Sequence, residues 1–167
     1  MGVLQAQVWI EGTRPLLWHR FAPESLAAEA GRRVERTGGK GNDPEEWKRG
    51  VLATAKGQLY LEPSYIFGCL RDAGHYTRSG RGSLQRAITA TLQVLSEKIL
   101  VDRFIKGDGS LVTDPTAPVY LDVRMVRNPA TGGRNVRYRV AAKAGWRTEF
   151  AIAGTARLSA GSRSRRC

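Results

Sequence analysis

Two segments near the carboxyl end alternate their side chains with a period of two, as a β-strand with one buried side does. The first covers residues 119–127 and the second residues 136–143. The loop between them contains Pro129 and the Gly132-Gly133 pair, which are residues typical of a hairpin turn. We therefore expect an antiparallel β-hairpin here, and this expectation constrains the fold more than any other feature of the sequence.

The polar side of the expected hairpin is rich in basic residues. Its candidate phosphate contacts are Arg124, Arg137, Arg139 and Lys143. From Pro115 to Cys167 there are eleven Lys or Arg residues against two acidic ones, and the whole chain has a net charge of +12. A solvent-exposed sheet face that carries arginines is typical of polyanion binding, so nucleic acid is the expected partner. The alternative is a protein that its charge merely keeps soluble.

The rest of the chain mixes strand and helix patterns. Strands are expected over residues 3–11, 58–61 and 148–158, with a small hairpin over 99–112. Helices are expected over residues 23–36, 63–77 and 83–99, with a short one opened by Asp43 and Pro44. Strands at both ends with helices between them predict an α+β fold, an antiparallel sheet with helices packed on one face. We expect one domain over residues 1–158 and a disordered basic tail over 159–167.

Several classes of protein are disfavoured by what the sequence lacks. No apolar run approaches the ~20 residues that cross a bilayer, and no secretory signal pattern opens the chain, so we expect a cytoplasmic protein without a membrane partner. Cys69 and Cys167 cannot form a disulfide framework. His19 and His75 are not in a metal-binding spacing, so we expect no metal and no cofactor.

No catalytic motif is recognisable in the sequence. There is no nucleophile elbow and no Walker loop, and no serine or cysteine can be placed beside a histidine. Asp102, Asp108 and Asp114 are spaced through expected turns, where aspartate is common for local reasons. We therefore predict a protein without enzymatic activity. A metal-dependent nuclease that uses Asp102, Asp108 or Asp114 is the alternative.

A second basic segment lies in the middle of the chain. Arg78, Arg81 and Arg86 surround two glycines just before and within an expected helix. Free backbone N–H groups and mobile guanidinium groups in such a segment can bind a phosphate, although glycine loops with arginine are also ordinary solvated connections.

Two further residues are candidates for contacts with a nucleic acid. Trp146 lies just past the basic hairpin and could stack on an unpaired base. His19 follows Trp18 and precedes Arg20, so it could contact a base or a phosphate. For both residues, ordinary packing within the protein is the alternative.

Two segments carry a family resemblance. The first expected strand is followed by Gly12-Thr13-Arg14-Pro15-Leu16-Leu17, and residues 60–73 read Tyr60-Leu61-Glu62-Pro63-Ser64-Tyr65-Ile66-Phe67-Gly68-Cys69-Leu70-Arg71-Asp72-Ala73. The first resembles the opening strand and Gly-x-x-Pro-Leu exit of the RAMP superfamily, the RNA-recognition-motif-like subunits of CRISPR effector complexes. The second is similar to that family's Ile-Pro-Gly-Ser-Ser-Leu-Lys-Gly-Ala-Leu-Arg element, with Gly68 and Arg71 at its helix glycine and arginine. Ser64 departs from it, because a glycine is expected there.

The resemblance implies an RNA-recognition-motif-like (ferredoxin-like) fold and RNA as the ligand, with Arg71 among the contacts. It implies a repeated backbone subunit of an antiviral CRISPR ribonucleoprotein, with other copies of the chain or effector-complex subunits as partners. It also gives Gly68 a reason, the close approach of its helix to backbone or RNA. The Pro-Leu-Leu opening also resembles small phage-encoded proteins.

Taken together, these patterns predict a non-catalytic protein that binds single-stranded nucleic acid, preferably RNA, through the phosphate backbone. The alternative from a different class is a phage or mobile-element structural protein, whose basic surface docks an acidic partner or packaged nucleic acid.

Overall fold

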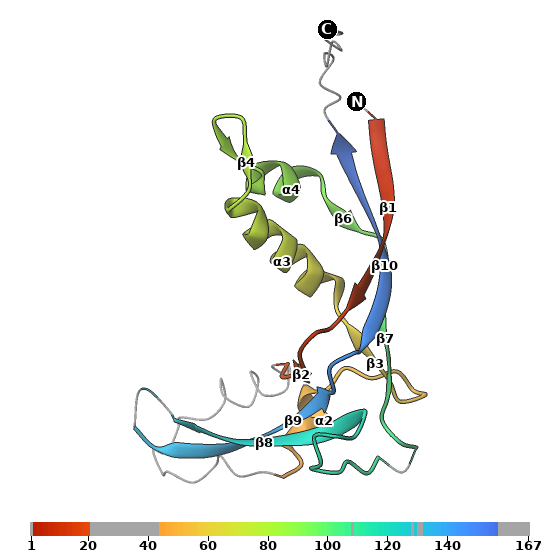
Figure 1. The fold of residues 1–167 in the computed structure, drawn as a ribbon, viewed down its shortest axis with the longest axis vertical. Helices are drawn as coiled ribbons and strands as arrows, with labels where there is room; N and C mark the ends of the chain where they lie inside the picture. The colour runs from red at the N-terminus through yellow and green to blue at the C-terminus, as the bar shows by residue number, and fades with distance from the viewer. Residues whose placement is uncertain (1, 21–43, 108, 128, 130–131, 157–167) are drawn as a thin grey trace, which may run out of the picture. The chain divides into compact units, whose positions relative to one another are not determined.

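The protein is described by a computed structural model in which residues 2–20, 44–107, 109–127, 129 and 132–156 are placed (Figure 1). These residues form helices and antiparallel sheets, so the predicted α+β class is confirmed. Among them, no helix is both long enough and apolar enough to span a membrane. The predicted helix over 23–36, the helix-opening Asp43 and the tail over 159–167 lie outside the described residues.

The chain divides into two compact units, which are described separately below. Unit 1 comprises Met1–Ile10, Leu61–Ile99 and Glu149–Cys167, and unit 2 comprises Glu11–Tyr60 and Leu100–Thr148. The expectation of a single domain over residues 1–158 stays a prediction.

Unit 1 contains a sheet built on the last strand of the chain. Strand β10 (Arg147–Ala156) pairs with β1 (Gly2–Glu11) and, antiparallel, with the short strand β6 (Gln93–Val94). Both long strands were predicted from the sequence, over residues 3–11 and 148–158. Phe150 and Ala153 of β10 are buried, at 2% and 7% exposure. The apolar core of this unit therefore lies against β10.

Two helices of unit 1 flank a small hairpin. Helix α3 (Pro63–His75) begins with Pro63 at its first turn, a position where the missing N–H costs nothing. The two-residue strands β4 (Arg78–Ser79) and β5 (Gly82–Ser83) then pair before helix α4 (Gln85–Thr91). Gly74 lets α3 and α4 approach closely, because a β-carbon there would lie 3.2 Å from Gln85 Cα. The predicted helix over 63–77 is confirmed to within two residues.

The predicted helix over 83–99 is wrong in length. Ser83, the first residue of the predicted helix, lies in β5, and α4 ends at Thr91, where the Thr91 hydroxyl donates back to the Ala87 carbonyl at 2.8 Å. Ile99 begins strand β7 (Ile99–Phe104) and is fully buried together with Val101. Burial of alternate residues in a sheet therefore outweighs the helical spacing of the leucines and isoleucines in this segment.

Unit 2 contains the predicted basic hairpin. Strand β8 (Val119–Arg127) pairs antiparallel with β9 (Arg134–Ala142), and β9 also pairs with β2 (Leu16–Trp18). The register runs from Val119 opposite Ala142 to Arg127 opposite Arg134. The hairpin and the alternation of its side chains are therefore confirmed, but the two faces do not divide into one buried and one exposed side, because Met125 is 63% exposed and Ala141 is fully buried.

The rest of unit 2 supplies its core and a short helix. Strand β3 (Gln58–Leu61) neighbours β7, and helix α2 (Glu46–Gly50) packs against β9. Leu59, Val101 and Val140 are fully buried. The predicted small hairpin over 99–112 is wrong in its second half, because no strand is described at 111–112. There, the Val112 carbonyl accepts a hydrogen bond from Leu121 N at 2.8 Å.

Candidate nucleic-acid interface

Three arginines of unit 2 share one face of the β8–β9 hairpin. Arg124 lies directly opposite Arg137, and Asp122 lies directly opposite Arg139. Directly opposed residues of an antiparallel pair project from the same side of the sheet. We call Arg124, Arg137 and Arg139 the β8–β9 arginine face. The prediction that these residues lie together is confirmed.

The β8–β9 arginine face carries carboxylate partners that the sequence does not predict. The Arg137 guanidinium pairs with the carboxylate of Glu46, whose second oxygen accepts the Tyr138 backbone N–H at 3.4 Å. Helix α2 brings Glu46 to this position because it packs against β9.

A second carboxylate comes from β8 itself. Arg124 Nε donates to Asp122 Oδ1 at 2.8 Å, and the Asp122 side chain is only 9% exposed. Two of the three arginines are therefore paired with carboxylates, which the sequence did not predict, although the Arg124 side chain remains 61% exposed. The physical reason is that like charges set directly across a ladder repel, and the two carboxylates offset that repulsion.

The cross-strand pair of Asp122 and Arg139 contains side-chain atoms without hydrogen-bond partners. Arg139 Nε and Asp122 Oδ2 are buried and have no hydrogen-bond partner among the described residues. A buried polar atom left unpaired costs about 1–3 kcal/mol. Arg139 is therefore the member of the face with the most to gain from an additional acceptor.

His19 follows β2 and lies within electrostatic range of the arginine face. Burial is the main cause that lowers its pKa below the usual 6.5, and the positive charges of Arg139 and Arg137 add to this effect. Glu46 acts in the opposite direction. The structure thus brings His19 together with two of the arginines that the sequence singled out.

Lys143 and Trp146 follow β9 and make contacts within unit 2. The Lys143 ammonium group is exposed and donates to the Thr116 carbonyl at 3.4 Å. The Trp146 indole N–H donates to the Arg14 carbonyl at 3.0 Å, and a β-carbon at Gly12 would overlap its ring. Trp146 therefore packs on the exit of β1, and its role in stacking on a base stays a prediction.

The basic residues of unit 1 are placed differently. The side chains of Arg78, Arg81 and Arg86 are exposed and have no hydrogen-bond or ion-pair partner among the described residues. We call these three arginines the β4–β5 basic surface. Because no Asp or Glu occurs between Ala73 and Ser96, no neighbour in the sequence neutralises them.

The backbone of the β4–β5 hairpin is uncovered at its two glycines, as far as the described residues show. Gly80 has a φ of +61°, which favours glycine at the turn, and a β-carbon at Gly80 or Gly82 would meet no atom within 4 Å. Next to the hairpin, Tyr76 is 87% exposed, and its ring lies edge-on to His75 with centroids 5.2 Å apart. Sequence reasoning missed Tyr76, although its place beside the basic segment was a usable signal.

Helix α3 carries the two residues that the family resemblance singled out. Arg71 is exposed, and its Nε donates to Asp72 Oδ1 at 2.8 Å, which lowers the pKa of Asp72. A β-carbon at Gly68 would meet nothing within 4 Å. The expectation that Gly68 allows close approach to protein backbone is therefore wrong within the described residues, and approach to RNA stays a prediction.

The aspartates proposed for a nuclease are engaged locally. Asp102 Oδ1 accepts the Arg147 backbone N–H at 2.6 Å. The Thr116 hydroxyl and backbone N–H both donate to Asp114 and lower its pKa. Asp108 lies outside the described residues. Within the placed part of the chain, no group of three or more His, Cys, Asp or Glu residues is arranged to hold a metal ion.

Sequence reasoning missed two features of unit 2. Glu46 was not linked to Arg137, since 91 residues separate them. Arg127 and Arg134 face each other at the loop end of the hairpin and are exposed, on the side opposite to the arginine face. The period-two pattern of the strands could have shown that Arg127 and Arg134 lie on the side opposite to Arg124 and Arg137.

The chain matches no protein-family model, and no curated protein matches it.

Proposed function

We propose that this chain binds single-stranded nucleic acid, with RNA preferred over DNA, through the phosphate backbone. The observation that carries the proposal is the β4–β5 basic surface, where three exposed arginines lack any acidic partner among the described residues. Phosphates are attracted to such a cluster and release counterions when they bind. The guanidinium fork also matches the oxygens of a phosphate in a bidentate fashion.

Neighbouring groups complement these arginines. The open backbone at Gly80 and Gly82 would allow a phosphate to reach main-chain N–H groups. The exposed ring of Tyr76 offers a face on which an unpaired base could stack, an interaction that tolerates any sequence. These features favour an unpaired strand, because bases inside a duplex are already stacked on each other.

The β8–β9 arginine face is proposed as a secondary contact. A phosphate at Arg137 would have to compete with Glu46, and one at Arg124 would have to compete with Asp122. Arg139 Nε has no hydrogen-bond partner among the described residues, but it is buried. The expected contribution of this face is therefore smaller than that of the β4–β5 basic surface.

The finer fold and the cellular role are also proposals. The α+β class with antiparallel sheets is compatible with an RNA-recognition-motif-like arrangement. Gly12 directly follows β1, and Pro63 begins the helix that carries Arg71, as the RAMP resemblance requires. On these grounds we propose a cytoplasmic backbone subunit of a CRISPR-type ribonucleoprotein, in which several copies follow one RNA.

The binding proposal is tested with two variants, each of which loses three positive charges from a different part of the chain. The variant R78Q/R81Q/R86Q removes the β4–β5 basic surface, and K56Q/K98Q/K106Q removes the same charge at three exposed lysines elsewhere. Binding to fluorescently labelled RNA and DNA oligonucleotides is measured by anisotropy. We expect the arginine variant to bind about tenfold more weakly than the lysine variant, because guanidinium groups at the contact neutralise phosphates directly.

Three further results separate the competing functions. Equal losses in the two variants would refute the β4–β5 basic surface as the binding site. Tight binding to polyglutamate, without a fixed site size on oligonucleotides, would favour the docking protein. Cleavage of labelled RNA in magnesium or manganese, abolished by Asp102→Asn, would favour the nuclease.

A further inference from the structure

Strand β1 is a long edge strand with an open outer side. It is the first strand in its sheet and pairs only with β10 among the described residues (Figure 1). Its ten residues include Val3, Leu4 and Trp9, which are 67%, 60% and 69% exposed. Proteins usually protect such an edge with charged residues or proline. From residue 2 to residue 10, β1 has neither.

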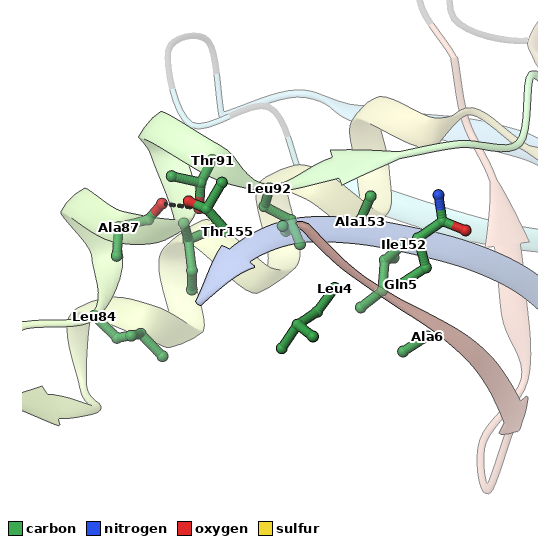
Figure 2. Close-up of a pocket in the computed structure, with 12 residues that line it drawn as sticks. Leu4, Gln5, Ala6, Leu84, Ala87, Thr91, Leu92, Ile152, Ala153 and Thr155 are labelled. Atoms are coloured by element: carbon green, nitrogen blue, oxygen red, sulfur yellow. Dashed lines mark hydrogen bonds between the residues drawn. The ribbon is translucent and has the colours of Figure 1, made fainter. Parts of the chain in front are cut away.

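One face of β1 also borders an apolar groove. Leu4 and Ala6 lie on the same face of the strand, two residues apart, and both line this groove of about 290 Å³ in unit 1 (Figure 2). Its other walls come from Leu84, which precedes α4, from Ile88 of α4 and from Ile152 of β10. An additional strand beside β1 would extend this apolar wall and remove more of it from water, which favours association.

The side chains of β1 are self-complementary about Ala6. In an antiparallel pair centred on this residue, Gln5 of one chain faces Gln7 of the second copy. Leu4 then faces Val8, and Val3 faces Trp9. From residue 3 to residue 9, each residue meets another of its own chemical class, and no two like charges are opposed, which is the condition for a favourable cross-strand ladder.

We propose that the chain forms a two-fold symmetric dimer in which the β1 strands of two copies pair antiparallel about Ala6. A second copy fits this edge better than an acidic or basic partner, because the paired segment of β1 has no charge to attract one. The contact is isologous, so the same residues serve both copies and this interface joins two chains. It uses none of the arginines proposed to bind nucleic acid.

The test measures the molar mass of the protein in solution. Nuclease and high salt first remove any bound nucleic acid, and the ratio of absorbance at 260 and 280 nm shows that the removal is complete. Light scattering coupled to size exclusion should give twice the 18.4 kDa mass of one chain. The variant Q5K/Q7K then puts the same positive charge at both positions of each Gln5–Gln7 pair across the interface. Two-fold symmetry creates this repulsion twice.

The matched variant Q5E/Q7K puts opposite charges at the two positions of each pair instead. Both variants carry Gln7→Lys, whose new ammonium group lies near Glu149, the acceptor of a 2.7 Å hydrogen bond from Gln7 in the native chain, so this substitution is common to both and they differ only at residue 5. We expect the dimer dissociation constant of Q5K/Q7K to be about tenfold higher than that of Q5E/Q7K, since two repulsive pairs replace two attractive ones. Circular dichroism confirms that both variants are folded.

Three results would overturn the proposal. The first is a monomeric native chain at its highest soluble concentration. The second is a dimer that both variants retain with equal affinity, which would place the interface elsewhere. The third is equal weakening of the dimer by both variants, which would exclude this antiparallel register.

Discussion

Two glycines of helix α3 are predicted to respond in opposite ways to the same substitution. Gly68 lies in the interior of the helix, where a β-carbon would meet no atom within 4 Å. Alanine at such a position should stabilise the protein by up to about 1 kcal/mol, because glycine loses more conformational freedom on folding. Nothing within the described residues opposes this gain.

Gly74 is buried where α3 meets α4. A β-carbon there would lie 2.6 Å from Ile88 Cδ1 and 3.2 Å from Gln85 Cα and N. The Ile88 methyl group can move aside, but the backbone of α4 must shift, and overpacking of this kind costs about 1–3 kcal/mol. Because Gly74 is next to the last residue of the helix, the offsetting gain in propensity is small. We expect Gly74→Ala to destabilise the protein by about 1–2 kcal/mol.

Urea denaturation followed by circular dichroism measures both effects. The urea concentration at the unfolding midpoint should be higher for Gly68→Ala and lower for Gly74→Ala than for the native chain. The dependence of the unfolding free energy on urea concentration should be the same for all three proteins. A fall for Gly68→Ala of the same size as that for Gly74→Ala would refute the reasoning, since it would mean that residue 68 is packed against something. Weaker RNA binding by a stabilised Gly68→Ala variant would support close approach of RNA to α3.

Three further predictions concern unit 2. Glu46→Gln should lower stability by about 1 kcal/mol and strengthen RNA binding at low salt, because Arg137 loses its carboxylate; unchanged denaturation and anisotropy would contradict this. For His19, the folded pKa lies below 6.5, so the unfolded chain binds more protons and stability should fall as pH drops below 6.5. His19→Gln should flatten that fall in urea midpoints, and an NMR titration midpoint above 6.5 would contradict it. Gly12→Ala should displace the Trp146 ring, lower stability by about 2–3 kcal/mol and red-shift tryptophan emission; an unshifted spectrum would refute the packing.

Local patterns were sufficient to predict the hairpin of unit 2. The alternation over residues 119–127 and 136–143 and the intervening glycine pair depend only on neighbours in the sequence, so the two strands and the residues that share a side follow directly. The helix over 83–99 failed for the opposite reason. Ile99 and Val101 are buried by strands distant in sequence, and no local propensity reports that burial.

The candidate site was predictable only in part. Arg124 and Arg137 were placed on one face correctly, but their carboxylate partners were not foreseen. Asp122 could have been recognised, because it lies two residues from Arg124 in the same strand. Glu46 could not, since its contact with Arg137 depends on how α2 packs on β9. By contrast, the charge of the β4–β5 basic surface is visible in the sequence because no acid lies near it.

The salt dependence of RNA binding tests the central claim most directly. The logarithm of the association constant is measured against the logarithm of salt concentration for the native chain, R78Q/R81Q/R86Q and K56Q/K98Q/K106Q. Each phosphate neutralised on a single strand contributes about −0.7 to the slope, so loss of three contacts should make the slope of the arginine variant about 2 units shallower. The lysine variant should keep a slope close to that of the native chain. An arginine variant with the native slope would contradict the proposal that these three guanidinium groups bind phosphates.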